Sequence, residues 1–131
     1  NSYIKKLKME KNIFIKGWIK DTKKYFLKAK IFVLSSKYEG LGNVLIDAIN
    51  YNLPCITTDC KSGPREILIS SKGGEFIKIG NYKKLSDKLN FVHQNYNTSL
   101  NKTNFAKKRL SRFLITKGCQ EHLNYFDECI K

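Results

Sequence analysis

The chain has 131 residues and a formal net charge of +14, because 25 lysines and arginines stand against 11 aspartates and glutamates. This length fits one domain at most, and a 41% share of hydrophobic residues excludes a disordered tail or a fibrous repeat. No apolar run approaches the roughly 20 residues that cross a bilayer, and the first residues lack the apolar block of a signal peptide. We therefore expect a cytoplasmic protein. The first residue is Asn1 rather than methionine, which favours a truncated N-terminus.

The basic charge has two interpretations. All but three of the basic residues are lysine, and these lysines can simply form a solvated surface. They can also attract a phosphate-rich partner, such as an anionic membrane face, a lipid-linked phosphate or a nucleic acid. Base recognition more often uses planar arginine forks, and only Arg65, Arg109 and Arg112 are arginines. We therefore expect no nucleic-acid partner, and a basic nucleic-acid-binding module is kept as an alternative function.

The cysteines and histidines do not follow a metal-binding pattern. The four cysteines stand at positions 55, 60, 119 and 129, and these gaps fit neither a zinc ribbon nor a redox pair. In a cytosolic protein they are expected to stay reduced. His93 and His122 have no carboxylate or cysteine at ligand spacing. We expect neither a metal nor a cofactor.

The first quarter of the sequence predicts a strand, a helix and a second strand. The first strand is expected over residues 13–15, just before the turn at Gly17. Asp21 then offers an N-cap for a helix through Ala29, in which Tyr25, Phe26 and Ala29 share one face. Residues 31–34 follow as an uninterrupted apolar run, which is typical of a strand buried on both faces of a parallel sheet.

The rest of the chain alternates in the same way until it becomes wholly helical. Helices are expected over residues 43–51, from Pro64, over 82–94, over 101–113 and over 117–130, and strands over 55–58 and 75–79. The first of these helices turns Val44, Leu45, Ala48 and Ile49 inward, and the helix over 82–94 carries Leu85, Leu89 and Val92 on one stripe. The pattern predicts an α/β fold, a Rossmann-like parallel sheet flanked by helices, with a helical C-terminus.

The loop after the strand at 31–34 is the main candidate site. In an open parallel sheet, ligands bind beyond the carboxyl ends of the strands, where loops lead into helices. Gly40 and Gly42 precede a helix N-terminus, whose free N–H groups and dipole favour a phosphate. Glu39 and Asp47 could accept hydrogen bonds from sugar hydroxyls. The competing interpretation is an ordinary glycine turn with a solvated Glu39 and a surface Asp47.

Four segments of the sequence resemble a known family. They are residues 33–48, VLSSKYEGLGNVLIDA, then Leu53-Pro54, residues 58–60, TDC, and residues 62–68, SGPREIL. Together they resemble the C-terminal domain of family 4 retaining glycosyltransferases, and weaker similarity covers nearly the whole chain. The resemblance implies the C-terminal half of the GT-B architecture, in which two Rossmann-like domains face a cleft and the C-terminal one holds most of the nucleotide-sugar donor.

The resemblance also implies roles for single residues. Glu39 matches a catalytic glutamate that contacts the donor sugar, and Asp47 falls where a second glutamate holds the ribose, although aspartate is one methylene shorter. Arg65 and Glu66 are given mainly structural weight. The remaining implied donor contacts form two groups, the diphosphate cradle at Gly40, Leu41, Gly42, Asn43 and Val44, and the border of the base at Gly17, Trp18 and Ile19. Trp18 has a second interpretation as a core side chain.

The function implied by this resemblance is transfer of a sugar from a nucleoside-diphosphate sugar, UDP favoured, to an acceptor hydroxyl with retention and without a metal. Many enzymes of this family act on envelope or lipid-linked glycans, so the resemblance implies a role in bacterial envelope or lipid-linked glycan synthesis. Residues 1–131 would then be a single, N-terminally truncated nucleotide-sugar-binding domain, inactive without its missing N-terminal GT-B domain. An anionic membrane surface on the cytoplasmic side is a further expected partner. The alternatives are a GT-B-type epimerase or phosphorylase, an inactive donor-binding remnant, and the nucleic-acid-binding module.

Overall fold

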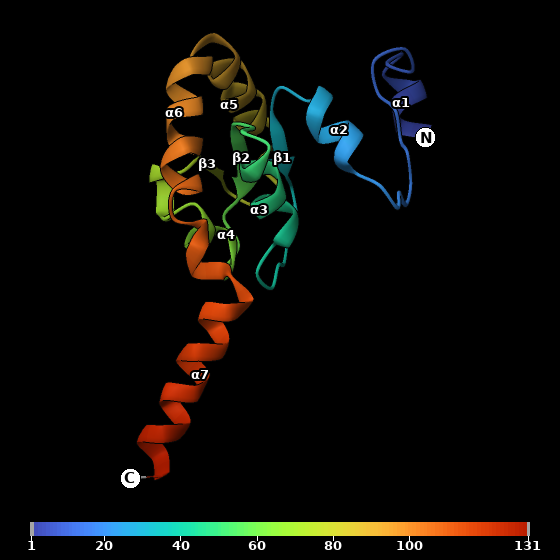
Figure 1. The fold of residues 1–131 in the computed structure, drawn as a ribbon. Coiled ribbons are helices and arrows are strands. Elements are labelled where there is room, and N and C mark those ends of the chain that lie inside the picture. The colour runs from blue at the N-terminus through green and yellow to red at the C-terminus, as the bar shows by residue number, and fades with distance from the viewer. Residues whose placement is uncertain (1, 131) are drawn as a thin grey trace.

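A computed structural model describes residues 2–130, without the side chain of residue 130. The elements in chain order are α1 (Ser2–Lys6), α2 (Lys23–Lys28), β1 (Phe32–Leu34), α3 (Asn43–Asn50), β2 (Cys55–Thr58), α4 (Pro64–Ile67), the short 3-10 helix η1 (Ser70–Lys72), β3 (Glu75–Ile77), α5 (Tyr82–Gln94), α6 (Tyr96–Lys107), the 3-10 helix η2 (Leu110–Phe113) and α7 (Ile115–Ile130). The strands form one sheet in the order β1-β2-β3, with helices on both sides (Figure 1).

Both strand pairs of the sheet are parallel. Phe32 lies opposite Cys55 in the first pair, and Ile56 lies opposite Glu75 in the second. All four residues of the central strand β2 are buried, as expected for a strand that is covered on both faces. Because the strands are parallel, the loops that follow β1 and β2 meet at the same edge of the sheet.

One face of the sheet packs against α3, α6 and α2. In α3, Leu45, Ala48 and Ile49 recur at helical spacing and are fully buried. Burial of a leucine or isoleucine side chain stabilises a fold by about 1.5–3 kcal/mol, so this stripe fixes α3 against the sheet. The whole cluster on this face comprises Phe26, Leu34, Leu45, Ala48, Ile49, Leu53, Cys55, Ile67, Leu68, Ala106 and Leu110.

The opposite face packs against α5. Ile56 of β2 and Ile77 of β3 contact Val92, and Leu85 and Leu89 pack against this cluster from the same helix. The predicted stripe of α5 is therefore confirmed. Successive residues of β2 belong to the two different clusters, because side chains alternate between the faces of a strand.

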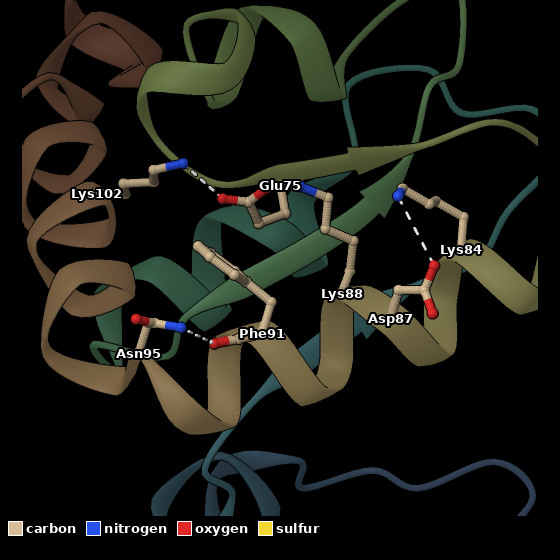
Figure 2. A network of polar contacts seen from close by, with 7 residues as sticks. All are labelled: Glu75, Lys84, Asp87, Lys88, Phe91, Asn95 and Lys102. Carbon is tan, nitrogen blue, oxygen red and sulfur yellow. Dashed lines mark hydrogen bonds and ion pairs between the residues drawn. The ribbon is translucent and has the colours of Figure 1, made fainter.

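A buried carboxylate at the start of β3 joins this strand to α5 and α6. Glu75 is 6% exposed, and Figure 2 shows its side chain between two lysines. Lys88 of α5 donates to Oε2 and Lys102 of α6 donates to Oε1, both at 2.5 Å. The carboxylate thus connects α5 and α6 to the sheet.

The four cysteines are free thiols, two of them buried and two exposed. Burial raises the pKa of the Cys55 thiol to about 12, so Cys55 behaves as a small apolar side chain. In the part of the chain that the structure describes, no helix is long and apolar enough to cross a membrane.

The prediction of a strand over residues 13–15 is wrong. These residues lie in an extended segment between α1 and α2, and Phe14 and Ile15 are 68% and 65% exposed. A strand needs a partner for its backbone hydrogen bonds, and among residues 2–130 the sheet contains β1, β2 and β3 alone. The apolar run is thus present without the neighbour that would make it a strand.

Three further details differ from the prediction. Val44 does not face the core but is 37% exposed, because it lies in the first turn of α3 beside the loop. The helix expected over 101–113 begins earlier, at Tyr96, and ends at Lys107, before a separate 3-10 turn at η2. The helix expected after an N-cap at Asp21 and through Ala29 is the shorter α2, whose N-cap is Thr22; in it Phe26 is buried and Tyr25 is 39% exposed.

Candidate functional site

The loop between β1 and α3, residues 35–42, is hydrogen-bonded to residues at the end of β2. The buried Thr58 hydroxyl lies 3.3 Å from the carbonyl oxygen of Leu34 and 2.5 Å from that of Ser36. The thiol of Cys60 donates to the same Ser36 carbonyl at 3.3 Å. These contacts span more than twenty residues of sequence, so the path of the loop is set by tertiary structure.

Further along, the same loop lies against residues 62 and 63. The Ser62 hydroxyl donates to the backbone carbonyl of Glu39 at 2.9 Å. A Cβ placed on Gly63 would lie 2.4 Å from the carbonyl oxygens of both Gly40 and Leu41. Gly63 has a φ of +77°, so both its space and its conformation require glycine.

The loop ends at the N-terminus of α3. Gly42 is the N-cap residue, with a φ of 85° in the left-handed region and no side-chain hydrogen bond that would cap the helix. The first N–H groups of a helix have no acceptor within it, and they carry the positive end of the helix dipole. Gly40, Leu41, Asn43 and Val44 are exposed around this end. The arrangement is suited to binding an anion such as a phosphate.

Glu39 lies directly beside this helix end. Its side chain is half-buried, and its Oε2 atom lies 3.9 Å from the position that a Cβ on Gly42 would occupy. The structure therefore brings Glu39 together with the predicted cradle residues 40–44. The role of Glu39 toward a donor sugar and the competing interpretation of a solvated carboxylate both stay predictions.

Asp47 lies one turn further along α3, on the exposed side of the helix. It lines a cavity of about 470 Å³ together with Asn43 and Asn50 of α3 and with Ser111 and Phe113 of η2. Asn43, a predicted cradle residue, thus borders the same cavity. Nothing in the sequence between residues 43 and 50 indicates that η2 would form its other wall.

Gly17, Trp18 and Ile19 are not brought to this loop. They lie in the segment between α1 and α2, which extends away from the body of the molecule (Figure 1). Gly17 has a φ of 67°, as a turn requires, whereas Trp18 is 86% exposed. The alternative of a core tryptophan is therefore wrong, and the role of these residues at the base stays a prediction.

An ion pair stabilises the loop after β2. Arg65 donates from Nε and Nη2 to the two carboxylate oxygens of Asp59, each at 2.6 Å. The hydrogen bond to Asp59 and the charge of this carboxylate raise the pKa of Arg65. Pro64 occupies the first turn of α4, where a missing N–H costs nothing, as predicted. In residues 2–130 no three histidine, cysteine or acidic side chains gather as metal ligands would.

The residues that hold the loop in place are not evident from the sequence. Thr58, Ser62 and Gly63 belong to segments that resemble the family, but these segments alone predict no contact with residues 36–41. The one available signal was the Ser-Gly-Pro sequence directly after a strand, which marks a sharp turn at the same sheet edge.

Known proteins are similar to this chain in sequence and in fold. The family described as "Glycosyl transferases group 1" matches residues 1–109. An uncharacterized glycosyltransferase of Methanocaldococcus jannaschii is 48% identical over 65 residues, which are 50% of this chain and 16% of that protein. The N-acetylgalactosamine-N,N'-diacetylbacillosaminyl-diphospho-undecaprenol 4-alpha-N-acetylgalactosaminyltransferase of Campylobacter jejuni is 28% identical over 122 residues, 93% of this chain and 33% of that protein.

A solved structure of similar fold is that of a mutant of Staphylococcus aureus TarM in complex with fondaparinux, alpha-GlcNAc-glycerol and UDP. It has a TM-score of 0.83 and 25% identity over 95% of this chain and 26% of that chain. The present chain spans between about an eighth and a third of the curated relatives it matches. The predicted fold, the C-terminal half of a GT-B glycosyltransferase, is confirmed, and the chain belongs to the group 1 glycosyl transferases.

Proposed function

We propose that this chain is the donor-binding domain of a retaining glycosyltransferase that takes its sugar from a UDP-sugar and transfers it to an acceptor hydroxyl. The observation that carries the proposal is the loop 39–42 at the N-terminus of α3, with Glu39 beside an uncapped helix end. The helix end can hold the diphosphate, while a carboxylate next to it can accept hydrogen bonds from sugar hydroxyls.

During sugar transfer, the nucleoside diphosphate leaves as an anion, and the site must stabilise its negative charge. Backbone N–H groups of Gly42, Asn43 and Val44 and the dipole of α3 are preorganised for this, so they require no rearrangement during the reaction. Glu39 would contact the donor sugar near its reacting carbon. Asp47, in its cavity, would hold the ribose, with a water bridging any gap left by the shorter side chain. None of these steps requires a bound metal.

Two comparisons favour this donor and this setting. The TarM complex, at 25% identity, contains UDP. The Campylobacter relative is named for transfer onto a diphospho-undecaprenol-linked sugar, which favours bacterial envelope or lipid-linked glycan synthesis. Since the relatives are several times longer, the acceptor site is assigned to an N-terminal GT-B domain outside this chain.

Calorimetric titration of the chain with UDP, GDP and a short DNA duplex at moderate salt tests the proposal. We expect UDP to bind, and Asp47→Ala to weaken its binding about tenfold or more, because a hydrogen bond to a charged group is worth about 1.5–3 kcal/mol. Asp127→Ala removes another exposed aspartate, which lies in α7 outside the site, and should leave binding unchanged.

The other outcomes would separate the alternatives. GDP binding that Asp47→Ala weakens would keep the glycosyltransferase proposal and change the base. Binding of DNA alone would favour the nucleic-acid-binding module that the +14 charge suggests, and this binding should weaken steeply as salt is raised. Binding of neither nucleotide would contradict the assignment of a donor site to this chain.

A further inference from the structure

We propose that Ser62 and Gly63 are positioning residues, which orient the backbone N–H groups of residues 40–42 toward the bound diphosphate. This inference rests on the proposed function for the identity of the ligand. The observation behind this inference does not depend on the ligand: three successive carbonyl groups of the loop contact these two residues.

The first contact is the hydrogen bond of Ser62 to the carbonyl oxygen of Glu39, at 2.9 Å. Ser62 is exposed, so its hydroxyl could bond to water equally well and burial does not force this contact. The bond joins residues 23 apart in sequence. It fixes the peptide plane that links Glu39 to Gly40, and with it the backbone from which the Glu39 carboxylate projects.

The second contact is the close approach of the loop backbone to Gly63, which is possible because Gly63 has no side chain. The carbonyl oxygens of Gly40 and Leu41 approach it so closely that a Cβ would lie 2.4 Å from each. Both clashing atoms are backbone atoms, which cannot rotate away as the end of a flexible side chain can. Any residue other than glycine at this position must therefore displace the loop.

The direction of the carbonyl groups sets the direction of the N–H groups. In a trans peptide, the C=O of one residue and the N–H of the next point in opposite directions, and the described chain contains no cis peptide. The carbonyls of residues 39–41 turn toward Ser62 and Gly63, so the N–H groups of Gly40, Leu41 and Gly42 turn away from them. Successive N–H groups presented on one side form a concave anion site.

Gly63 also has a structural role at the start of α4, which an experiment must distinguish from its role in positioning the loop. Its carbonyl accepts hydrogen bonds from the N–H groups of Glu66 and Ile67, at 2.9 and 3.0 Å, and thereby starts α4. Gly63→Ala could therefore disturb α4 as well as the loop. Ser62 carries no such bond, and its substitution tests the positioning role alone.

The test compares Ser62→Ala with the conservative Ser62→Thr, which keeps the hydroxyl. We expect Ser62→Ala to weaken UDP binding about three- to tenfold in calorimetry, because the loop would then have to be ordered on binding, and to lower the thermal midpoint by a few °C at most, since the Ser62 hydroxyl is exposed. Ser62→Thr should restore the affinity. Ser86→Ala, an exposed serine of α5, is the matched control and should change neither quantity.

A second measurement does not depend on the ligand. In the free chain, NMR order parameters of the N–H bonds of residues 40–42 should fall in Ser62→Ala, from about 0.85 toward values below about 0.6. Unchanged order parameters together with unchanged UDP affinity would overturn the inference. If the wild-type chain bound neither UDP nor GDP, the proposed function would fail, whereas the order parameters would still decide whether Ser62 holds the loop.

Discussion

At the scale of single residues, Glu75 shows how a charge is kept inside this domain. Burial raises the pKa of Glu75, but hydrogen bonds and the charges of Lys102 and Lys88 together outweigh burial and hold its pKa below the ordinary value. Both lysines are partly exposed, with side-chain exposures of 33% and 28%, so their ammonium groups keep contact with water. The pair of lysines therefore avoids most of the desolvation cost of a fully buried ion pair.

Replacing this carboxylate should destabilise the chain. Glu75→Gln removes the charge that both lysines contact and leaves one side-chain acceptor, so we expect a loss of about 1–3 kcal/mol in urea unfolding at pH 7. Asp87→Asn is the control, because Asp87 makes an exposed pair with Lys84 at 3.7 Å, also drawn in Figure 2. It should change stability by less than about 0.5 kcal/mol. Equal effects of the two variants would contradict the assigned importance of Glu75.

The same group predicts a pH dependence with a definite sign. A carboxyl whose pKa is lower in the folded than in the unfolded chain stabilises the fold above its unfolded pKa. This contribution falls as the pH drops from the unfolded value, about 4.3, through the lower folded pKa. The stability difference between wild type and Glu75→Gln should therefore be constant near neutrality and shrink below about pH 4. Unfolding curves at pH 7, 5 and 3.5 would show a growing difference if this sign were wrong.

At the scale of elements, the sequence predicted what depends on local pattern. The runs at 31–34 and 55–58 are apolar without interruption, and both became strands because a parallel sheet buries both faces. The stripe of α5 was equally clear. The segment 13–15 has the same apolar character, but a strand also depends on a neighbour, which local pattern does not reveal.

The candidate site also has parts that local sequence predicts and parts that depend on contacts between distant residues. Gly40, Gly42 and Glu39 were predicted because a glycine turn before a helix is visible in the sequence. The contacts of Thr58 and Ser62 with the loop were not, since they join residues 22–24 apart and require the sheet register. The wall that η2 gives to the Asp47 cavity comes from still further along the chain.

The last helix, α7, is predicted to be dispensable for the stability of the body. Its residues from Ile115 to Cys129 are exposed apart from the half-buried Gly118, and Figure 1 shows the helix extending away from the sheet. A chain that ends at Leu114 should melt within about 3 °C of the full chain in differential scanning calorimetry. Trp18 fluorescence would not serve, because this tryptophan is 86% exposed on the N-terminal segment.

The control for this truncation is Leu110→Ala. Leu110 of η2 is 9% exposed and belongs to the core, so its truncation should cost about 2–5 kcal/mol. A fall of about 10 °C or more on removing α7 would mean that the helix packs on the body in solution.

At the scale of the whole molecule, the charge of +14 comes from lysines and arginines that are spread along the whole chain. Lys83 and Lys84 begin α5, directly after the carboxyl end of β3. Lys107 and Lys108 stand at the end of α6, which leads into η2, and η2 contacts α4 through Arg112. We expect these four lysines to contribute to binding at an anionic membrane, where a lipid-linked acceptor would lie.

Exchanging all four of these lysines for glutamine should weaken binding to vesicles that contain anionic lipid at least tenfold in a sedimentation assay, since each lysine near the surface contributes about 1 kcal/mol. Lys107 contributes less than its exposure suggests, because its ammonium already donates to the carbonyl of Asn50 and to Asn52, both at 2.8 Å. The matched control exchanges Lys5, Lys6, Lys23 and Lys24, which changes the net charge equally at the other end of the chain. If both variants lost the same affinity, net charge alone would explain the binding and no oriented surface would be needed. Loss in the first variant only, disappearing at high salt and on neutral vesicles, would show that the domain meets the membrane through these four lysines.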